Sequence, residues 1–237
     1  MLRRSLAAFA ALLLAASAAR AQDLTAICRR LTRPPLGAWS EFRVVGGQGD
    51  GATLRMAVVG TESHGDTAYL WMEFAAHGFP MGRGAEHGDT VSLINRMLVP
   101  GFGPGMAEPR AHVMKFDGAP AMEMPVGRAH GQSAPGANAL QDCARGKVVG
   151  WESVTVPAGT FRALHVQDTE GHGDSWVVPD LPFALVRAGV GAADDSGRME
   201  LVAHGMGAKS QITETPRPYD PQLFFQMLMR QREGGGH

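Results

Sequence analysis

Residues 150–187 read GWESVTVPAGTFRALHVQDTEGHGDSWVVPDLPFALVR. Apolar and polar residues alternate on both sides of Pro157-Ala158-Gly159, which is the pattern of two strands joined by a tight turn. Proline presets its own φ angle and glycine tolerates a positive one, so both suit such a turn. Strand patterns follow at residues 176–178 and 183–188, with two prolines between them. The stretch therefore predicts an antiparallel meander.

The same alternation recurs along the rest of the chain. Residues 39–45 and 52–59 read as strands around a glycine-rich hairpin, and residues 67–74 repeat the pattern with one apolar face. Residues 90–99 fit a helix as well as a strand. Further strands are expected at residues 111–116, 147–156, 161–167, 199–204 and 209–213. Glycine and proline mark loops at residues 75–88, 100–109 and 127–137.

A short helix is expected at each end of the strands. Asp23 can cap the first, which Pro34 stops, and Asp220 with Pro221 can begin the second. The second helix has an apolar stripe that is expected to pack on the core: Leu223, Phe224, Met227 and Leu228. The predicted fold class is mainly β (α+β), a curved antiparallel sheet or incomplete β-barrel packed on a few helices. One β-rich domain is expected over residues 22–231, before a disordered tail at residues 232–237.

The N-terminus has the features of a secretory signal peptide. Arg3 and Arg4 precede an apolar run that is about half the roughly 20 residues that a membrane span needs. Small residues end the run at Ala21. We expect cleavage after Ala21, which would remove residues 1–21 and leave no transmembrane segment. The expected location is the periplasm or the exterior of the cell.

The charge of the mature chain argues against nucleic acid as a partner. Loss of the signal peptide removes three of the 22 Lys and Arg and leaves 19 against 23 Asp and Glu, a net charge of minus four. The lysines are scattered at Lys115, Lys147 and Lys209. A nucleic-acid groove would require clustered basic residues, and attraction to an anionic membrane would require them as well.

Cys28 and Cys143 are the two cysteines. In an oxidising compartment they can form one disulfide. Such a bond would close a long loop and stabilise the chain by about 4 to 5 kcal/mol through the entropy of the unfolded state. The alternative is two buried free thiols.

One family resemblance can be named from these residues. Residues 152–161, followed by Trp176 and residues 179–186, resemble a repeated pattern of exported bacterial domains similar to the LolA/LolB-like lipoprotein carriers. The likeness lies within residues 150–187 and consists of turn residues and apolar positions. It implies an incomplete antiparallel β-barrel around one or more helices, with an apolar cavity that accepts acyl chains. It implies no catalytic residue.

A cavity of this kind would be lined by adaptable apolar side chains. The chain holds 13 methionines, whose flexible thioethers suit varied acyl chains. A lipid or an acylated protein is therefore the expected partner, and the candidate lining residues are Leu54, Met56, Met72, Phe74, Met114 and Trp176. Thioethers also bind Cu(I). The densest methionine cluster, Met122-Glu123-Met124, has no His or Met partner at a regular spacing along the chain, so core packing or adaptable lining is favoured.

Three His-Gly-Asp motifs begin at His64, His87 and His172. Their imidazoles and carboxylates would suit Zn²⁺, but uneven spacing in loops favours turns that precede strands. Nucleophilic catalysis has no support either, since Ser63 and Ser133 both miss the G-x-S-x-G elbow by one position. The remaining candidate bases lie in predicted strands and are expected to be hydrogen-bonded sheet histidines: His112, His165 and His204. No cofactor, metal or catalytic residue is expected.

These observations predict a non-enzymatic periplasmic binding or carrier protein for a hydrophobic, lipid-like ligand or a lipidated partner. The first alternative is a structural or interaction protein of the cell envelope without a ligand. The second, carried by the His-Gly-Asp motifs, is a metal-assisted hydrolase. Specificity is expected in the loops at residues 75–88 and 100–109.

Overall fold

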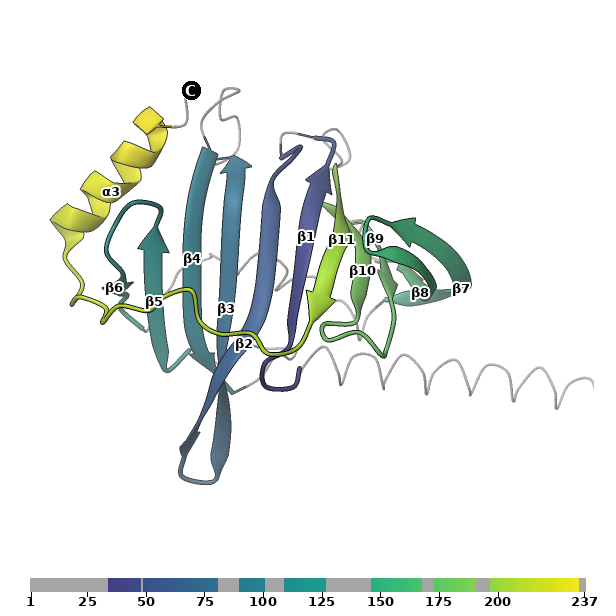
Figure 1. The fold of residues 1–237 in the computed structure, drawn as a ribbon, viewed down its shortest axis with the longest axis horizontal. Coiled ribbons are helices and arrows are strands. Elements are labelled where there is room, and N and C mark those ends of the chain that lie inside the picture. The colour runs from purple at the N-terminus through teal and green to yellow at the C-terminus, as the bar shows by residue number, and fades with distance from the viewer. Residues whose placement is uncertain are drawn as a thin grey trace, which may run out of the picture.

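Eleven antiparallel strands form one open sheet in the computed structural model of the chain (Figure 1). The structure describes residues 34–47, 49–80, 90–100, 109–126, 146–167, 173–190 and 197–234. The strands are β1 Trp39–Val45, β2 Thr53–His64, β3 Thr67–Pro80, β4 Thr90–Val99, β5 Ala111–Phe116, β6 Met122–Glu123, β7 Lys147–Val156, β8 Gly159–Gln167, β9 Asp174–Val177, β10 Leu185–Val190 and β11 Gly197–Gly205.

The sheet consists of two meanders joined in its middle. Its strand order is β6-β5-β4-β3-β2-β1-β11-β10-β9-β8-β7, so β1 pairs with β2 on one side and with β11 on the other. β6 and β7 stand at opposite ends, and the sheet does not close into a barrel. The expected mainly β class and curved antiparallel sheet are confirmed. Among the described residues there is one helix, α3 Pro221–Gly234, and the expected N-terminal helix lies outside them.

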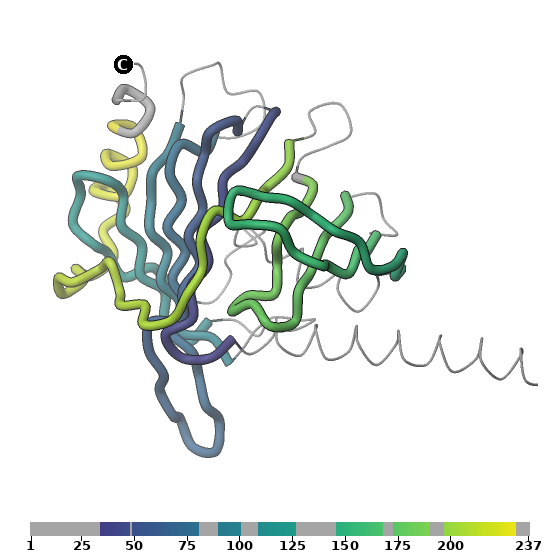
Figure 2. The backbone as a smooth tube through the Cα atoms, turned by 45° about the vertical axis from the view of Figure 1, so that its right-hand side comes forward, coloured from purple at the N-terminus to yellow at the C-terminus, as the bar shows by residue number. Residues whose placement is uncertain are grey.

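The β7–β8 hairpin folds back over the middle of the sheet (Figure 2). In its turn, the Ala158 N–H donates a hydrogen bond to the Leu201 carbonyl of β11 at 3.1 Å. Beside it, Arg187 Nη2 donates to the Thr155 carbonyl at 2.7 Å. These contacts roll one half of the sheet around its own inner side.

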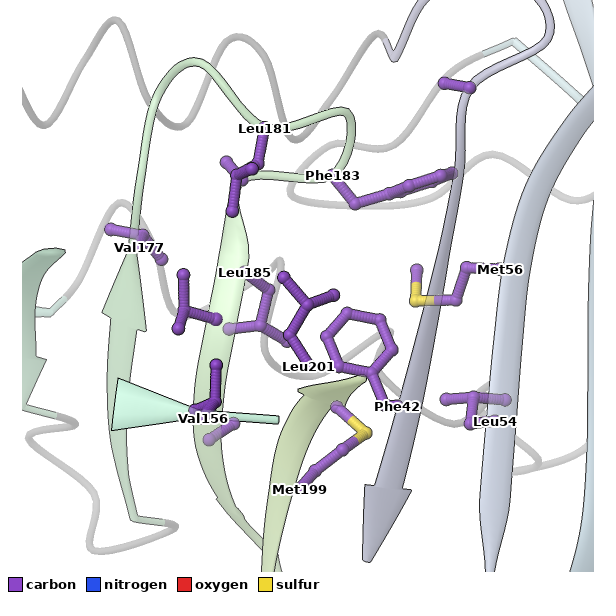
Figure 3. Close-up of a cluster of buried hydrophobic side chains, with 14 of the residues drawn as sticks. Phe42, Leu54, Met56, Val156, Val177, Leu181, Phe183, Leu185, Met199 and Leu201 are labelled. Carbon is purple, nitrogen blue, oxygen red and sulfur yellow. The ribbon is translucent and has the colours of Figure 1, made fainter. Parts of the chain in front are cut away.

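The main hydrophobic core fills the inside of this roll (Figure 3). Phe42 of β1 and Leu201 of β11 are paired in register and are both fully buried. Leu181 and Phe183 enter the core from the proline-bounded break between β9 and β10. The core thus joins both meanders, and apolar burial of this extent is the dominant favourable term in folding.

The structure corrects two expectations from the sequence and decides a third that was left open. The loop expected from residue 75 begins later, because β3 continues to Pro80 and pairs with both β2 and β4. The glycine that suggested a loop, Gly78, has a φ of 71° and lies at an irregularity of the pairing between Ala76 and Phe79. The strand therefore continues through a residue that is typical of a loop. Residues 90–99, which fitted two readings, form the strand β4. Residues 209–213 were expected to form a strand and do not.

Instead, residues 206–219 run across the sheet from β11 to the β6 edge and lead into α3 (Figure 1). We call this segment the C-terminal strap. Its end pairs with β6, where the Arg217 N–H donates to the Ala121 carbonyl at 2.9 Å and the Glu123 N–H donates to the Arg217 carbonyl at 2.8 Å. Asp220 then caps α3 by accepting the N–H groups of Gln222 and Leu223, as the sequence predicted.

Candidate functional site

The face of β1 to β5 that carries Phe42, Met56 and Phe74 is called the inner face here, because it points into the roll. Side chains that are directly opposite on neighbouring strands share a face. The register therefore sets out two rows of inner-face side chains. One row is Ser40, Met56, Phe74, Asn95, Met114 and Met122, and the other is Val58, Met72, Met97 and His112.

Both rows run from the core to less buried positions on β4 and β5. Met56, Met72 and Phe74 are at most 4% exposed. Farther along, at β4 and β5, Met97 and Met114 are only partly buried. The main core thus brings together four of the predicted lining residues: Leu54, Met56, Met72 and Phe74. A fifth, Met114, continues the first row toward the β6 edge.

Trp176, the sixth predicted lining residue, does not join these rows. Its ring is stacked on His165 with centroids 4.6 Å apart, and its Nε1 donates to Glu152. The guanidinium of Arg187, on β10, lies 5.6 Å from the centroid of the Trp176 ring. His165 in turn contacts the Asp174 carboxylate at 2.7 Å. Trp176 thus packs against the main core and also joins a polar cluster that spans β7 to β10.

A second apolar cluster lies between the inner face and α3, and is called the α3 cluster here. Leu93 and Phe116 are paired in register, and Phe224 of α3 packs near Phe116 with ring centroids 5.9 Å apart. Three described members are buried: Phe116, Met122 and Met227. Eight are only partly buried: Val91, Leu93, Met114, Ala119, Met124, Leu223, Phe224 and Leu228. The apolar stripe predicted for this helix thus packs on the sheet.

On the opposite, outer face, the C-terminal strap is held by a buried carboxylate. Glu73 of β3 is 1% exposed and accepts hydrogen bonds from Ser210 Oγ at 2.5 Å and the Gln211 N–H at 2.9 Å. Arg96 Nη1 donates to Ser210 Oγ at 3.0 Å and to the Ile212 carbonyl at 3.1 Å. These bonds satisfy polar groups that would be costly to bury alone. They fix the strap, and with it the start of α3.

Farther along the strap, Glu214 meets Lys115 of β5 with 2.8 Å between Oε1 and Nζ. The hydrogen bond from Lys115 lowers the pKa of Glu214 to about 2, with help from backbone N–H groups. Ile212 packs beneath with Val113 and Ala121. The β5–β6 edge is thus covered by the strap on the outer face and by α3 on the inner face.

His112, His165 and His204 lie in strands, and the first two are hydrogen-bonded there. His112 lies among the methionines. His112 Nε2 is 3.0 Å from Asn95 Oδ1. Burial lowers the pKa of His112 below its ordinary value of 6.5, so the neutral ring is favoured. His204, on β11, makes an edge contact with Phe161.

In the part of the chain that the structure describes, the residues considered for catalysis and for a zinc site do not come together. His64 lies at the end of β2, 3.1 Å from Glu62, whereas His87, His172 and Ser133 fall outside the described residues. Within the described ranges, no group of three His, Cys, Asp or Glu could hold a metal ion. Both cysteines, Cys28 and Cys143, also fall outside them. In those same ranges no helix has the length and apolar character needed to cross a membrane.

Comparisons with known proteins give only distant likenesses. No protein-family model matches the chain, and no curated protein matches its sequence. A hypothetical protein from Chlamydia trachomatis is similar in structure, with 9% identity, coverage of 81% of this chain and 97% of that chain, and a TM-score of 0.40. MucB, solved in complex with MucA(peri), gives 12% identity, 81% and 57% coverage, and a TM-score of 0.37.

A candidate exported protein with a YmcC-like fold from Bacteroides fragilis gives 11% identity, coverage of 72% of this chain and 96% of that chain, and a TM-score of 0.34. None of these three proteins is described as an enzyme. At these TM-scores the likeness establishes neither a common fold nor a common function.

Proposed function

We propose that this chain is a non-enzymatic binding or carrier protein of the bacterial envelope, and that it takes a hydrophobic, lipid-like ligand or the acyl chain of a lipidated partner between α3 and the inner face of β4 and β5. The α3 cluster carries this proposal. Its partly buried apolar side chains outnumber its buried ones, eight to three among the described residues. An acyl chain inserted there would remove further apolar surface from water, at about 25 cal/mol per Å².

The chemistry of the cluster suits a ligand of variable shape. Met114, Met122, Met124 and Met227 contribute thioethers to it, and unbranched methionine side chains repack around different shapes at low cost. The contacts between α3 and the sheet are apolar, as between Phe116 and Phe224. Because such contacts have no fixed direction, an acyl chain can replace them without leaving polar groups unpaired.

The arrangement of α3 also suits opening and closing. The strap that precedes the helix is held to the sheet by Glu73, Arg96 and Lys115. The helix itself begins after these anchors, at Pro221. It can therefore move away from β4 and β5 while its point of attachment stays in place. The signal peptide expected at residues 1–21 supports an envelope location for this activity.

Two neighbouring phenylalanines of α3 provide a matched test. Phe224 packs into the cluster, whereas Phe225 is 61% exposed. We expect the protein purified from the periplasm to enhance the fluorescence of N-phenyl-1-naphthylamine. Phe224→Asp should abolish this enhancement, because a carboxylate would be buried in the cluster, and Phe225→Asp should preserve it. Equal binding by the two variants, with both folded by circular dichroism, would contradict the proposed site.

A further inference from the structure

His112 is flanked by a methionine on each side. Met97 of β4 is its direct partner in the β4–β5 register. On the other side, the Met124 N–H donates to the His112 carbonyl at 2.8 Å, which continues the register of Val113 with Glu123 and of Met114 with Met122. Directly opposed residues of antiparallel strands have Cβ atoms about 4.5 to 5.5 Å apart on the same face. Two thioethers and one imidazole therefore lie side by side on the inner face, with the imidazole in the middle.

The contact with Asn95 leaves one nitrogen of the imidazole available to a metal ion. Asn95 Oδ1 can only accept a hydrogen bond, so Nε2 of His112 carries the proton in the contact between them. The lone pair then lies on Nδ1. In metal sites, a histidine ligand usually donates its other N–H to a carbonyl or carboxylate oxygen, which fixes the ring and its tautomer. Asn95 fills that place here.

The donor set is soft and uncharged. Glu123, between Met122 and Met124, alternates to the other face of its strand. No group of three His, Cys, Asp or Glu adjoins this row within the described ranges. The two thioethers favour Cu(I), and imidazole suits copper as well as zinc. Zn²⁺ sites are built from thiolate, imidazole and carboxylate ligands, and Mg²⁺ and Ca²⁺ prefer oxygen ligands. The side chains of Met97, His112 and Met124 are only partly buried, so an ion can reach them.

We propose that Met97, His112 and Met124 form a binding site for Cu(I), with Asn95 as the residue that positions the imidazole. This site differs in chemistry from the proposed acyl-chain site, although Met124 belongs to both. Leucine fills a volume similar to that of methionine and lacks the sulfur. Replacement of methionine by leucine therefore separates thioether chemistry from apolar packing.

The test is a competition for Cu(I) with bicinchoninate under anaerobic, reducing conditions. We expect the wild-type chain to withdraw one equivalent of Cu(I) from the chelator complex. Met97→Leu and Met124→Leu should each weaken binding by about tenfold or more, and Asn95→Ala by about 10- to 100-fold. Met206→Leu is the matched control, since Met206 is 58% exposed at the end of β11, and it should bind as the wild type does.

Two results would overturn the copper site. One is equal Cu(I) uptake by Met206→Leu and by the Met97→Leu/Met124→Leu double variant. The other is complete loss of uptake in Cys28→Ser/Cys143→Ser, which would place the ion on thiols. As a second readout, titration with Ag(I), a redox-inert ion of similar softness, should shift the methyl NMR signals of Met97 and Met124 and leave that of Met206 in place.

Failure of the copper site is distinguishable from failure of the acyl-chain site. The leucine variants keep the apolar surface, so they should still bind N-phenyl-1-naphthylamine. Phe224→Asp should lose the dye and keep Cu(I), because Phe224 is not one of the three proposed ligands, although it shares the α3 cluster with Met124. Loss of Cu(I) binding in Phe224→Asp, with the fold intact, would show that the two sites are one.

Discussion

The Ala158 N–H donates a hydrogen bond to the carbonyl of Leu201, although the two residues belong to opposite ends of the second meander. In the β10–β11 register the last partner of β11 is Glu200, so the carbonyl that follows has no ladder partner on that side. The turn of the β7–β8 hairpin supplies one. The residues that mark this turn in the sequence therefore also close the roll of the sheet.

The turn that makes this contact should be sensitive to charge, because it packs on the hydrophobic core. Ala158 is partly buried against the main core, and Ala158→Glu would bring a carboxylate to that surface. We expect a loss of about 1 to 3 kcal/mol in the free energy of unfolding, measured by urea denaturation. Ser153→Glu, at an exposed position of β7, should change it by less than about 0.5 kcal/mol. Equal losses would mean that the turn does not rest on the core.

The strap should depend on its buried carboxylate. Glu73→Ala would leave the Ser210 hydroxyl and the Gln211 N–H without their acceptor. We expect a loss of about 2 to 3 kcal/mol in the free energy of unfolding, as for other hydrogen bonds to charged groups. Glu123→Ala, which removes an exposed carboxylate from β6, is the control. If both variants unfold at the same urea concentration, Glu73 does not anchor the strap.

How much the sequence predicts depends on the distance between interacting residues. The expected bounds of β1, β5 and β7 agree with the structure, because alternation is local and ends at turn residues. Residues 209–213 were misread because apolar Ile212 between polar neighbours looks like a strand, whereas the segment is held by Glu73, 138 residues from Gln211. No local pattern carries that contact.

The candidate site shows the same limit. Alternation along β2 and β3 places Leu54, Met56, Met72 and Phe74 on one face, and these residues do share the core. The approach of Met97 and Met124 to His112 depends on the registers of three strands, and spacing along the chain could not reveal it. Trp176 packs against the same core, and its apolar ring gave no sign of its polar partners Glu152 and Arg187.

The pair of Glu214 and Lys115 should stabilise the fold in a defined pH range. The folded pKa of Glu214 is lowered from 4.5 to about 2, so its stabilisation is present above pH 4.5 and is lost as the pH falls toward 2. The carboxylate is 36% exposed, which limits the effect to about 1 kcal/mol. Glu214→Gln should thus be less stable than wild type above pH 4.5 and equal to it near pH 2. A constant difference in urea unfolding across this range would contradict the pairing.

His112 should make the fold sensitive to mild acid. Burial lowers its folded pKa below 6.5, the ordinary value that applies to the unfolded chain. The unfolded chain therefore binds the proton more readily, and stability is complete above pH 6.5 and falls as the pH drops from 6.5 to the folded pKa. His112→Phe keeps the ring and removes the titration. The difference in free energy of unfolding, wild type minus variant, should decrease as urea denaturation is repeated at lower pH through this window. A difference that stays level, or grows in acid, would show that the protonated ring is tolerated on the inner face, and the neutral ring needed for Cu(I) would then not be the favoured form.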